Sequence, residues 1–146
     1  VVVAETAEEA VRGSDVVITA TMSSSPVVKV DWISGGAHIT AMGSDEPGKQ
    51  ELDTKILARA DKVVVDSLKQ CARLGEVHHA LEDGSMEEGD VHAELGEVLL
   101  GKKPGRESDK EVTVCDLTGI AIQDVAISQF VYEKAMKSGK GFFIEV

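Results

Sequence analysis

Short, uninterrupted runs of apolar, mostly β-branched residues alternate along this chain with segments of helical character, and this alternation constrains the fold more than any other feature. The runs at residues 16–21, 63–65 and 112–115 are continuous rather than alternating, which is typical of strands buried on both faces of a parallel sheet. Strands separated by helices form right-handed βαβ units. We therefore predict an α/β fold with a doubly wound parallel sheet and helices on both faces. The expected strands are residues 1–4, 16–21, 37–42, 63–65 and 112–115.

Three segments carry helical signals. Thr6 can cap a short first helix, with Glu9 at the spacing of a capping box. A second helix is expected over residues 52–60, and a third over residues 120–137, where apolar side chains recur at helical spacing before Gly139. The acidic stretch 82–90 predicts a surface loop, and residues 142–144 predict a last extended piece.

Length, charge and cysteine content exclude several classes of protein. A chain of 146 residues suits one domain. Its formal net charge of −11 argues against a nucleic-acid partner, because phosphate binding needs clustered basic residues. No apolar run approaches the ~20 residues of a membrane span. Two distant cysteines without a CxxC motif indicate no disulfide framework, so a cytoplasmic location is expected. Because the chain opens on Val1 without an initiator Met, we expect a piece of a longer polypeptide.

Polar residues follow the expected strands, where open parallel sheets bind their ligands. The loop at residues 42–52 is the richest of these. Its Glu46-Pro47-Gly48-Lys49 segment predicts a type II turn that holds Asp45 and Lys49 on a rigid corner. A carboxylate fixed there suits general acid–base chemistry. The alternative, which spacing alone favours, is that Asp45 caps the turn or the following helix.

Other motifs give weaker signals. The adjacent His78 and His79 diverge by about 100° around a helix, and a zinc helix spacing is absent, so we predict no metal site. His38 lies within an expected strand and is interpreted as a hydrogen-bonded core residue. The sequence contains no GxSxG, Walker A or GxGxxG motif.

The loop at residues 43–52, with the sequence GSDEPGKQEL, closely resembles the GxDxPGKxEL signature of the ornithine cyclodeaminase/μ-crystallin family. The resemblance continues in order along nearly the whole chain. Its further segments are residues 15–21, 36–39, 64–67, 75–79, 94–98, 105–109 and 116–124. It implies a partial Rossmann-like sheet, with residues 1–119 as the later part of an NAD(P)-binding domain. Residues 120–146 would then form a helix and tail returning towards a dimerisation domain.

The resemblance also implies roles for individual residues. Asp45 corresponds to the catalytic acid/base and would also face the substrate, as would Thr118. Relatives often have Ser where this chain has Leu117, so only a backbone contact to the cofactor could be kept there. The positions implied to line the cofactor are Thr21, Met42, Gly43, Ser44, Asp45, Lys49 and Leu117.

The function that the resemblance implies is an enzyme that uses NAD or NADP. The substrate would be a small L-amino acid, to be oxidised or cyclised with loss of ammonia, or a cyclic imine, to be reduced. The assembly would be a homodimer. The alternatives are a nicotinamide-dependent binding protein of the μ-crystallin type and a purely structural dimer module. The Gly-rich turn and the residues that grip the substrate carboxylate would precede Val1. We therefore expect these 146 residues alone to bind nicotinamide poorly and to catalyse nothing.

Overall fold

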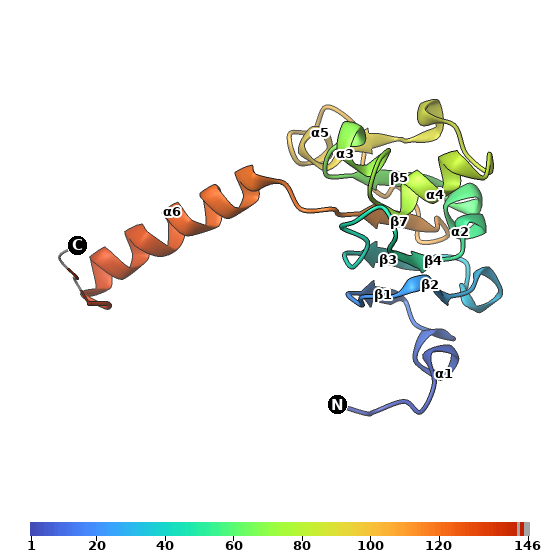
Figure 1. Cartoon of the computed structure of the whole chain (residues 1–146), viewed down its shortest axis with the longest axis horizontal. Helices are drawn as coiled ribbons and strands as arrows, with labels where there is room; N and C mark the ends of the chain where they lie inside the picture. The colour runs from blue at the N-terminus through green and yellow to red at the C-terminus, as the bar shows by residue number, and fades with distance from the viewer. Residues whose placement is uncertain (143, 145–146) are drawn as a thin grey trace.

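A five-stranded parallel sheet forms the centre of the molecule, as the computed structural model of residues 1–142 and 144 shows (Figure 1). All neighbouring strands are parallel, as predicted. The strands, in their order across the sheet, are β1 (Val16–Thr19), β3 (His38–Ala41), β7 (Thr113–Asp116), β5 (Lys62–Val65) and β6 (Ala93–Glu94).

One face of the sheet carries the hydrophobic core. Val17, Ile39, Val114 and Val63 lie side by side in one row across four strands, and all four are buried. Apolar side chains of the helices α2 (Thr54–Arg59) and α4 (Glu76–Glu82) belong to the same cluster. Removing this apolar surface from water is the main force that holds the sheet and these helices together.

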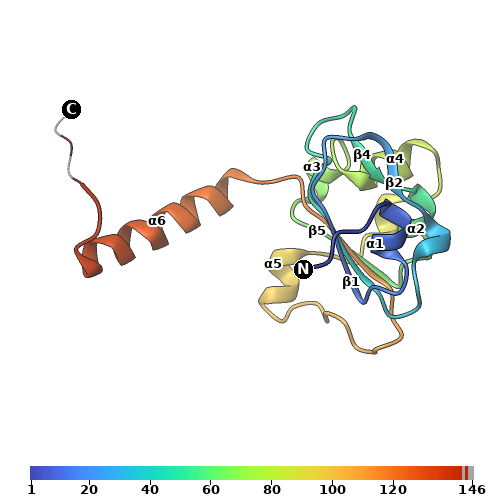
Figure 2. The same ribbon diagram turned by 90° about the horizontal axis from the view of Figure 1, so that it is seen from below.

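The opposite face is only partly covered. Helix α5 (Leu95–Leu99) lies over it, on the other side of the sheet from α1 (Ala7–Val11) and α2 (Figure 2). On the edge strand β1, Val16 and Ile18 point to this face and are 59% and 65% exposed. The helices thus lie on both faces, but they cover them unequally.

A second, two-stranded parallel sheet pairs β2 (Ser24–Val28) with β4 (Gln50–Leu52). The sequence did not predict it. β2 contains Pro26 and two serines, and β4 has only three residues, so neither strand shows an apolar run. This small sheet matters because β4 continues directly from the Asp45 loop and anchors its end.

The predicted helices form, with boundaries shifted by one or two residues. Thr6 caps α1, its hydroxyl accepting the N–H of Glu9 at 3.2 Å. Helix α2 begins after Asp53, whose carboxylate accepts the N–H of Lys55. The third predicted helix is α6 (Ala121–Ser138), and Gly139 ends it with a φ of 64°. None of its residues is buried, and both views show it extending away from the sheet (Figures 1 and 2).

One predicted strand does not form. Residues 1–4 form no strand and are largely exposed, because no neighbouring strand pairs with them. Stretch 82–90 is largely exposed, as predicted for a surface loop, but Met86 within it is buried and Glu88–Asp90 form a 3-10 helix. The predicted extended piece at 142–144 includes Phe143, which lies outside the described residues. Across the described part of the chain, no helix combines the length and the apolar character that a bilayer crossing requires.

Candidate functional site

The loops that follow four strands meet at the carboxyl edge of the sheet. Main-chain hydrogen bonds join them directly: Met42 N–H donates to the Thr19 carbonyl at 2.9 Å, and Leu117 N–H donates to the Ala41 carbonyl at 2.9 Å. Asp66 N–H donates to the Asp116 carbonyl at 3.2 Å. The predicted ligand edge is therefore one continuous structure built by β1, β3, β7 and β5.

Asp45 is the exposed carboxylate of this edge. Its Oδ1 accepts a hydrogen bond from Lys49 Nζ at 2.6 Å, and its side chain is 52% exposed. The hydrogen bond from Lys49 lowers the pKa of Asp45, although partial burial opposes the shift. The hydrogen bond to the Asp45 carboxylate in turn raises the pKa of Lys49. Asp45 is thus held as a carboxylate that can accept a proton. Asp53 caps α2 instead, so the helix-capping alternative for Asp45 is wrong.

The turn after Asp45 forms, but it is not of type II. Lys49 N–H donates to the Glu46 carbonyl at 3.0 Å, which closes the turn around Pro47. A type II turn requires a positive φ at its third residue, and Gly48 does not have one. The turn is further secured by Ser44, which is buried and whose Oγ lies 2.6 Å from the Lys49 carbonyl and 3.2 Å from that of Leu74.

Glu51, on β4, ties the Asp45 loop to the loop after β1. Its carboxylate is fully buried and accepts hydrogen bonds from Thr19 Oγ1 at 2.7 Å, from Gly43 N–H at 2.8 Å and from Thr21 N–H. Burial opposes ionisation of Glu51, but these donors outweigh it and lower its pKa. A Cβ on Gly43 would collide with the Thr21 carbonyl and the Glu51 carboxylate, so only glycine fits there.

Glu76 extends this network from the N-terminal turn of α4. Its two carboxylate oxygens accept the N–H groups of Glu51 and Leu52 at 2.8 and 3.0 Å. Burial raises the pKa of Glu76 to about 7, although these two hydrogen bonds oppose the shift. Glu76 therefore holds β4 in place, and through β4 it holds the Glu51 carboxylate against the loops that follow β1 and β3.

Asp116, at the end of β7, is the second buried carboxylate near α4. It accepts the N–H of Val77 at 3.0 Å, while its Oδ1 has no hydrogen-bond partner. Burial raises the pKa of Asp116 to about 6. A Cβ on Gly75 would collide with this carboxylate, so the glycine before α4 permits the close approach. An unpartnered buried oxygen is costly unless the group binds a proton, which agrees with the raised pKa.

Thr118 and Asp66 connect β5 to the loop after β7. The Thr118 side chain is buried and its Oγ1 donates to Asp66 Oδ1 at 3.1 Å, while Gly119 N–H donates to Asp66 Oδ2 at 2.7 Å. Cys71 also contacts Asp66, at 3.3 Å, and burial raises the pKa of this thiol. Both cysteines are free and buried, as expected without a disulfide.

A cavity of about 260 Å³ lies on the less covered face of the sheet, beneath α5. Leu117 lines it at the carboxyl edge, together with Val98 of α5, but Asp45 does not. His38 also lines the cavity and is half-buried, with Nδ1 2.7 Å from Thr113 Oγ1 and Nε2 3.1 Å from Thr40 Oγ1. Burial lowers the pKa of His38, which makes it a neutral, hydrogen-bonded residue as interpreted from the sequence.

The structure brings most of the sequence-predicted site residues to one edge of the sheet. Some of their side chains are exposed there, and others point to protein partners. Thr21 and Met42 are exposed there, beside Gly43. Ser44 and Thr118 lie at the same edge with their hydroxyls directed to protein partners. Sequence reasoning missed the supporting carboxylates Glu51 and Glu76. The signal that could have found them is an acidic residue in an apolar segment or next to a strand. Such a side chain is rarely buried unless hydrogen-bond donors surround its carboxylate.

An open parallel sheet with helices on both faces, whose polar loops meet at the carboxyl ends of its strands, has the architecture of the doubly wound α/β class. The family model of the ornithine cyclodeaminase/mu-crystallin family matches residues 1–139. The chain belongs to that family.

Curated relatives and solved structures agree with this membership. The chain is 53% identical over 135 residues to an alanine dehydrogenase of Archaeoglobus fulgidus, a match that covers 92% of this chain and 41% of the relative. A solved archaeal alanine dehydrogenase dimer with bound NAD superposes with a TM-score of 0.87 and 51% identity, covering 97% of this chain and 43% of that one.

A second solved structure is the Δ1-pyrroline-2-carboxylate reductase of Thermococcus litoralis in complex with NADH and L-proline. It superposes with a TM-score of 0.89 and 37% identity, covering 97% of this chain and 44% of that one. The chain thus spans about two fifths of the length of the relatives it matches.

Proposed function

We propose that this chain is part of an NAD(P)-dependent enzyme that oxidises or cyclises a small L-amino acid or reduces a cyclic imine, with Asp45 as the acid/base. The single observation that carries the proposal is the placement of Asp45. It is the exposed carboxylate at the carboxyl edge, held by Lys49 at 2.6 Å on a loop that buried groups immobilise. The named relatives that act on amino acids or imines support the same class of substrate.

Residues 1–119 would form the later part of the NAD(P)-binding domain, and residues 120–146 a helix and tail directed to the rest of the protein. The residues present fit one end of a dinucleotide. Thr21 and Met42 are exposed on neighbouring loops, after β1 and after β3. The apolar side chain of Leu117 lines the cavity beneath α5. The sequence has no GxGxxG turn to bind a pyrophosphate. We propose that Thr21, Met42, Gly43, Lys49 and Leu117 line the nicotinamide side, and that Ser44 contributes only its main chain, because its side chain is buried and bonded to protein carbonyls.

The nicotinamide, when bound, accepts or donates the hydride. The task left to the protein is to move a proton at the substrate nitrogen or at an attacking nucleophile. Asp45 can accept that proton because Lys49 keeps it ionised, and it can return the proton in the reverse direction. Ser44 and Glu51 fix the loop, so the carboxylate stays in one place through the reaction. Thr118 would lie near the substrate, with its hydroxyl anchored on Asp66.

The experiment uses the full-length protein with NAD or NADP and a panel of L-amino acids and cyclic imines, following reduced nicotinamide and ammonia together. Asp45→Asn is expected to lower kcat/KM by about 100-fold or more, since it removes the general base. Asp31→Asn, an exposed aspartate of the 3-10 helix before β3, is the matched control and should leave turnover unchanged.

Each product pattern distinguishes a reaction. Ammonia with accumulating reduced cofactor indicates a dehydrogenase, ammonia without net reduction a cyclodeaminase, and cofactor oxidation by an imine a reductase. Full activity of Asp45→Asn would overturn the assignment of Asp45. Nicotinamide binding without turnover on any substrate would instead support the binding-protein alternative.

A homodimer is the assembly we propose. On helix α6, Ile122, Val125, Phe130 and Val131 are each more than half exposed, and this helix contacts little of the described chain. Apolar surface of this kind is normally covered by another polypeptide segment, here the rest of the same protein or a second copy of it. The dimeric state of the solved archaeal alanine dehydrogenase agrees with this proposal. Sedimentation of the full-length protein tests it.

A further inference from the structure

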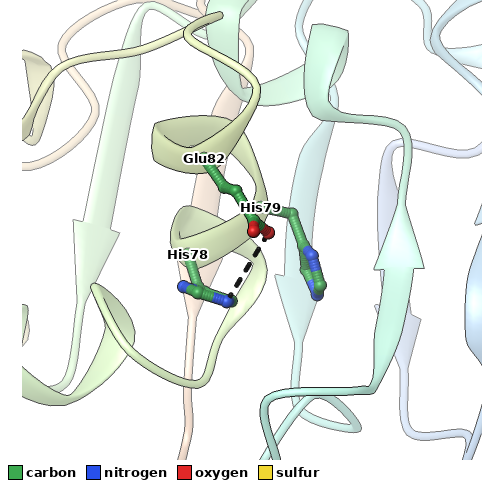
Figure 3. Close-up of side chains that lie close together, drawn as sticks. All are labelled: His78, His79 and Glu82. Atoms are coloured by element: carbon green, nitrogen blue, oxygen red, sulfur yellow. Dashed lines mark ion pairs between the residues drawn. The ribbon is translucent and has the colours of Figure 1, made fainter.

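Helix α4 carries a group of metal-ligand side chains outside the edge described above. His78, His79 and Glu82 each offer one ligand atom, and these atoms lie within 4.8 Å of one another. Figure 3 shows the Glu82 carboxylate lying between the two imidazole rings, with His78 Nε2 3.9 Å from Glu82 Oε2. The ring centroids are 5.2 Å apart and the ring planes are tilted by 58°, so the two imidazoles lie next to each other although their residues are adjacent on the helix.

Both imidazoles already have one nitrogen committed to a main-chain carbonyl. His79 Nε2 lies 2.7 Å from the Lys49 carbonyl oxygen, and His78 Nδ1 lies 3.3 Å from the Ala72 carbonyl oxygen. Because a carbonyl only accepts, each of these nitrogens must carry the proton. The lone pairs are therefore left on His78 Nε2 and His79 Nδ1. This is the outer-shell arrangement that fixes the tautomer and orientation of metal-binding histidines.

We propose that His78, His79 and Glu82 form a surface site for one divalent transition-metal ion, with Zn²⁺ as the ion of first choice. Two imidazole nitrogens and a carboxylate oxygen, completed by water, are a ligand set that Zn²⁺ accepts. Ligand atoms around a tetrahedral Zn²⁺ lie roughly 3.4 Å apart, from bond lengths of about 2.1 Å. Rotation of Glu82, whose side chain is 73% exposed, can bring its carboxylate to that spacing, and the two half-buried imidazoles would have to adjust as the ion binds. The net charge of −11 also favours a cation.

The site goes beyond the proposed function, because none of its three residues is proposed to contact cofactor or substrate, and His79 touches the Asp45 loop only through the Lys49 carbonyl. It differs from the sequence expectation of no metal, which assumed that adjacent histidines point apart by their helical spacing alone. Side-chain rotation and the two carbonyl anchors overcome that divergence. The anchors come from Ala72 and from Lys49, which the tertiary fold brings to α4.

The test is calorimetric titration of Zn²⁺ into the metal-free full-length protein at about pH 7.5, where histidine is mostly neutral. We expect one Zn²⁺ per chain, and at least tenfold weaker binding in His78→Ala and in Glu82→Gln. His79 is left unchanged because its ring also supports the Lys49 loop. His92→Ala is the matched control, since His92 bonds to the Pro104 carbonyl away from the cluster, and it should bind as wild type.

X-ray absorption of the Zn²⁺ complex supplies the second measurement. Nitrogen and oxygen ligands without sulfur support the site, while a sulfur ligand would indicate Cys71 or Cys115 and overturn it. Absence of stoichiometric binding, or equal affinity in wild type and in both variants, would also overturn it. Circular dichroism and melting of each variant ensure that a loss of binding is not a loss of fold.

Discussion

Two regions of the chain differ most in the burial of their side chains. One is the contact between β4 and α4, and the other is helix α6. In the first, Glu51 and Glu76 are at most 1% exposed, and each carboxylate oxygen has a main-chain or side-chain donor. In the second, 18 consecutive residues form a regular helix with no buried side chain. Local sequence signals suffice to specify α6, but the carboxylate network depends on segments far apart in the chain. The network is where substitutions should matter most.

Removing Glu51 should have the largest effect. Glu51→Ala leaves Thr19 Oγ1 and the N–H groups of Thr21 and Gly43 without their acceptor inside the protein. Each buried donor that loses its partner costs about 1–3 kcal/mol, so we expect a loss of roughly 3 kcal/mol in the free energy of unfolding. Urea denaturation measures it. Glu133→Gln, on the exposed helix α6, is the control. A loss below about 1 kcal/mol for Glu51→Ala would contradict the role of this network.

The pH dependence of stability should follow from Glu76 and Asp116. The pKa of Glu76 is about 7 in the folded protein, above its ordinary value of 4.5, and the pKa of Asp116 is about 6. Between the ordinary and the raised values the folded state binds more protons than the unfolded chain. The free energy of unfolding therefore falls as pH rises through this range, by on the order of 3 kcal/mol for Glu76.

Urea denaturation of wild type and Glu76→Gln between about pH 5 and about pH 7.5 tests this slope. The variant should have a flatter profile, with a residual slope from Asp116. Stability that rises with pH across this interval, or a slope that Glu76→Gln leaves intact, would show that Glu76 is not protonated in the folded protein.

A smaller loss is expected at Gly75. A Cβ there would collide with the Asp116 carboxylate, so Gly75→Ala must displace a buried group. Overpacking of this kind costs about 1–3 kcal/mol, and we expect about 1.5 kcal/mol by thermal or urea denaturation. Gly89→Ala is the matched control, because its Cβ would meet open space at a φ that any residue adopts. Equal stability of the two variants would argue against the close approach of Asp116 to α4.

The smallest effect on the 146-residue chain is expected on α6. Phe130 is 57% exposed, so Phe130→Ser should change the free energy of unfolding of this chain by less than ~0.5 kcal/mol. The same substitution in the full-length protein should weaken assembly, measured by sedimentation, if α6 packs there as proposed. A loss above about 1 kcal/mol in the 146-residue chain would mean that α6 packs against the sheet within it.

Much of the fold could be predicted from the sequence. The runs around Val17, Ile39, Val63 and Val114 predicted the four main strands, because each is a short apolar or β-branched segment. The expected burial on both faces holds for β7 and largely for β5, whereas β1 and β3 are fully buried only on alternate residues. Strand β2 and strand β6 could not be predicted, since one contains Pro26 and the other has two residues. Their extended conformation is imposed by pairing with β4 and β5.

The candidate site, like the fold, could be predicted from the sequence only in part. The loop GSDEPGKQEL identified Asp45 and Lys49, and their pairing follows from a spacing of four residues across a turn. Nothing local predicted that Ser44 would bond to the Leu74 carbonyl, or that His79 would bond to the Lys49 carbonyl. These contacts join residues about 30 positions apart, so they depend on how α4 packs against β4.

The sequence by itself determined the parallel α/β class, the polar loops after the strands, the Thr6 cap and the last helix, which it predicted over residues 120–137 and which spans Ala121–Ser138. These features depend on side-chain periodicity and on main-chain preferences that act within a few residues. Only the tertiary structure decided which carboxylates are buried, which glycines have no room for a side chain and which imidazole nitrogens are free. Those properties depend on desolvation and on donors supplied by distant segments, and both exist only once the sheet and its helices have packed.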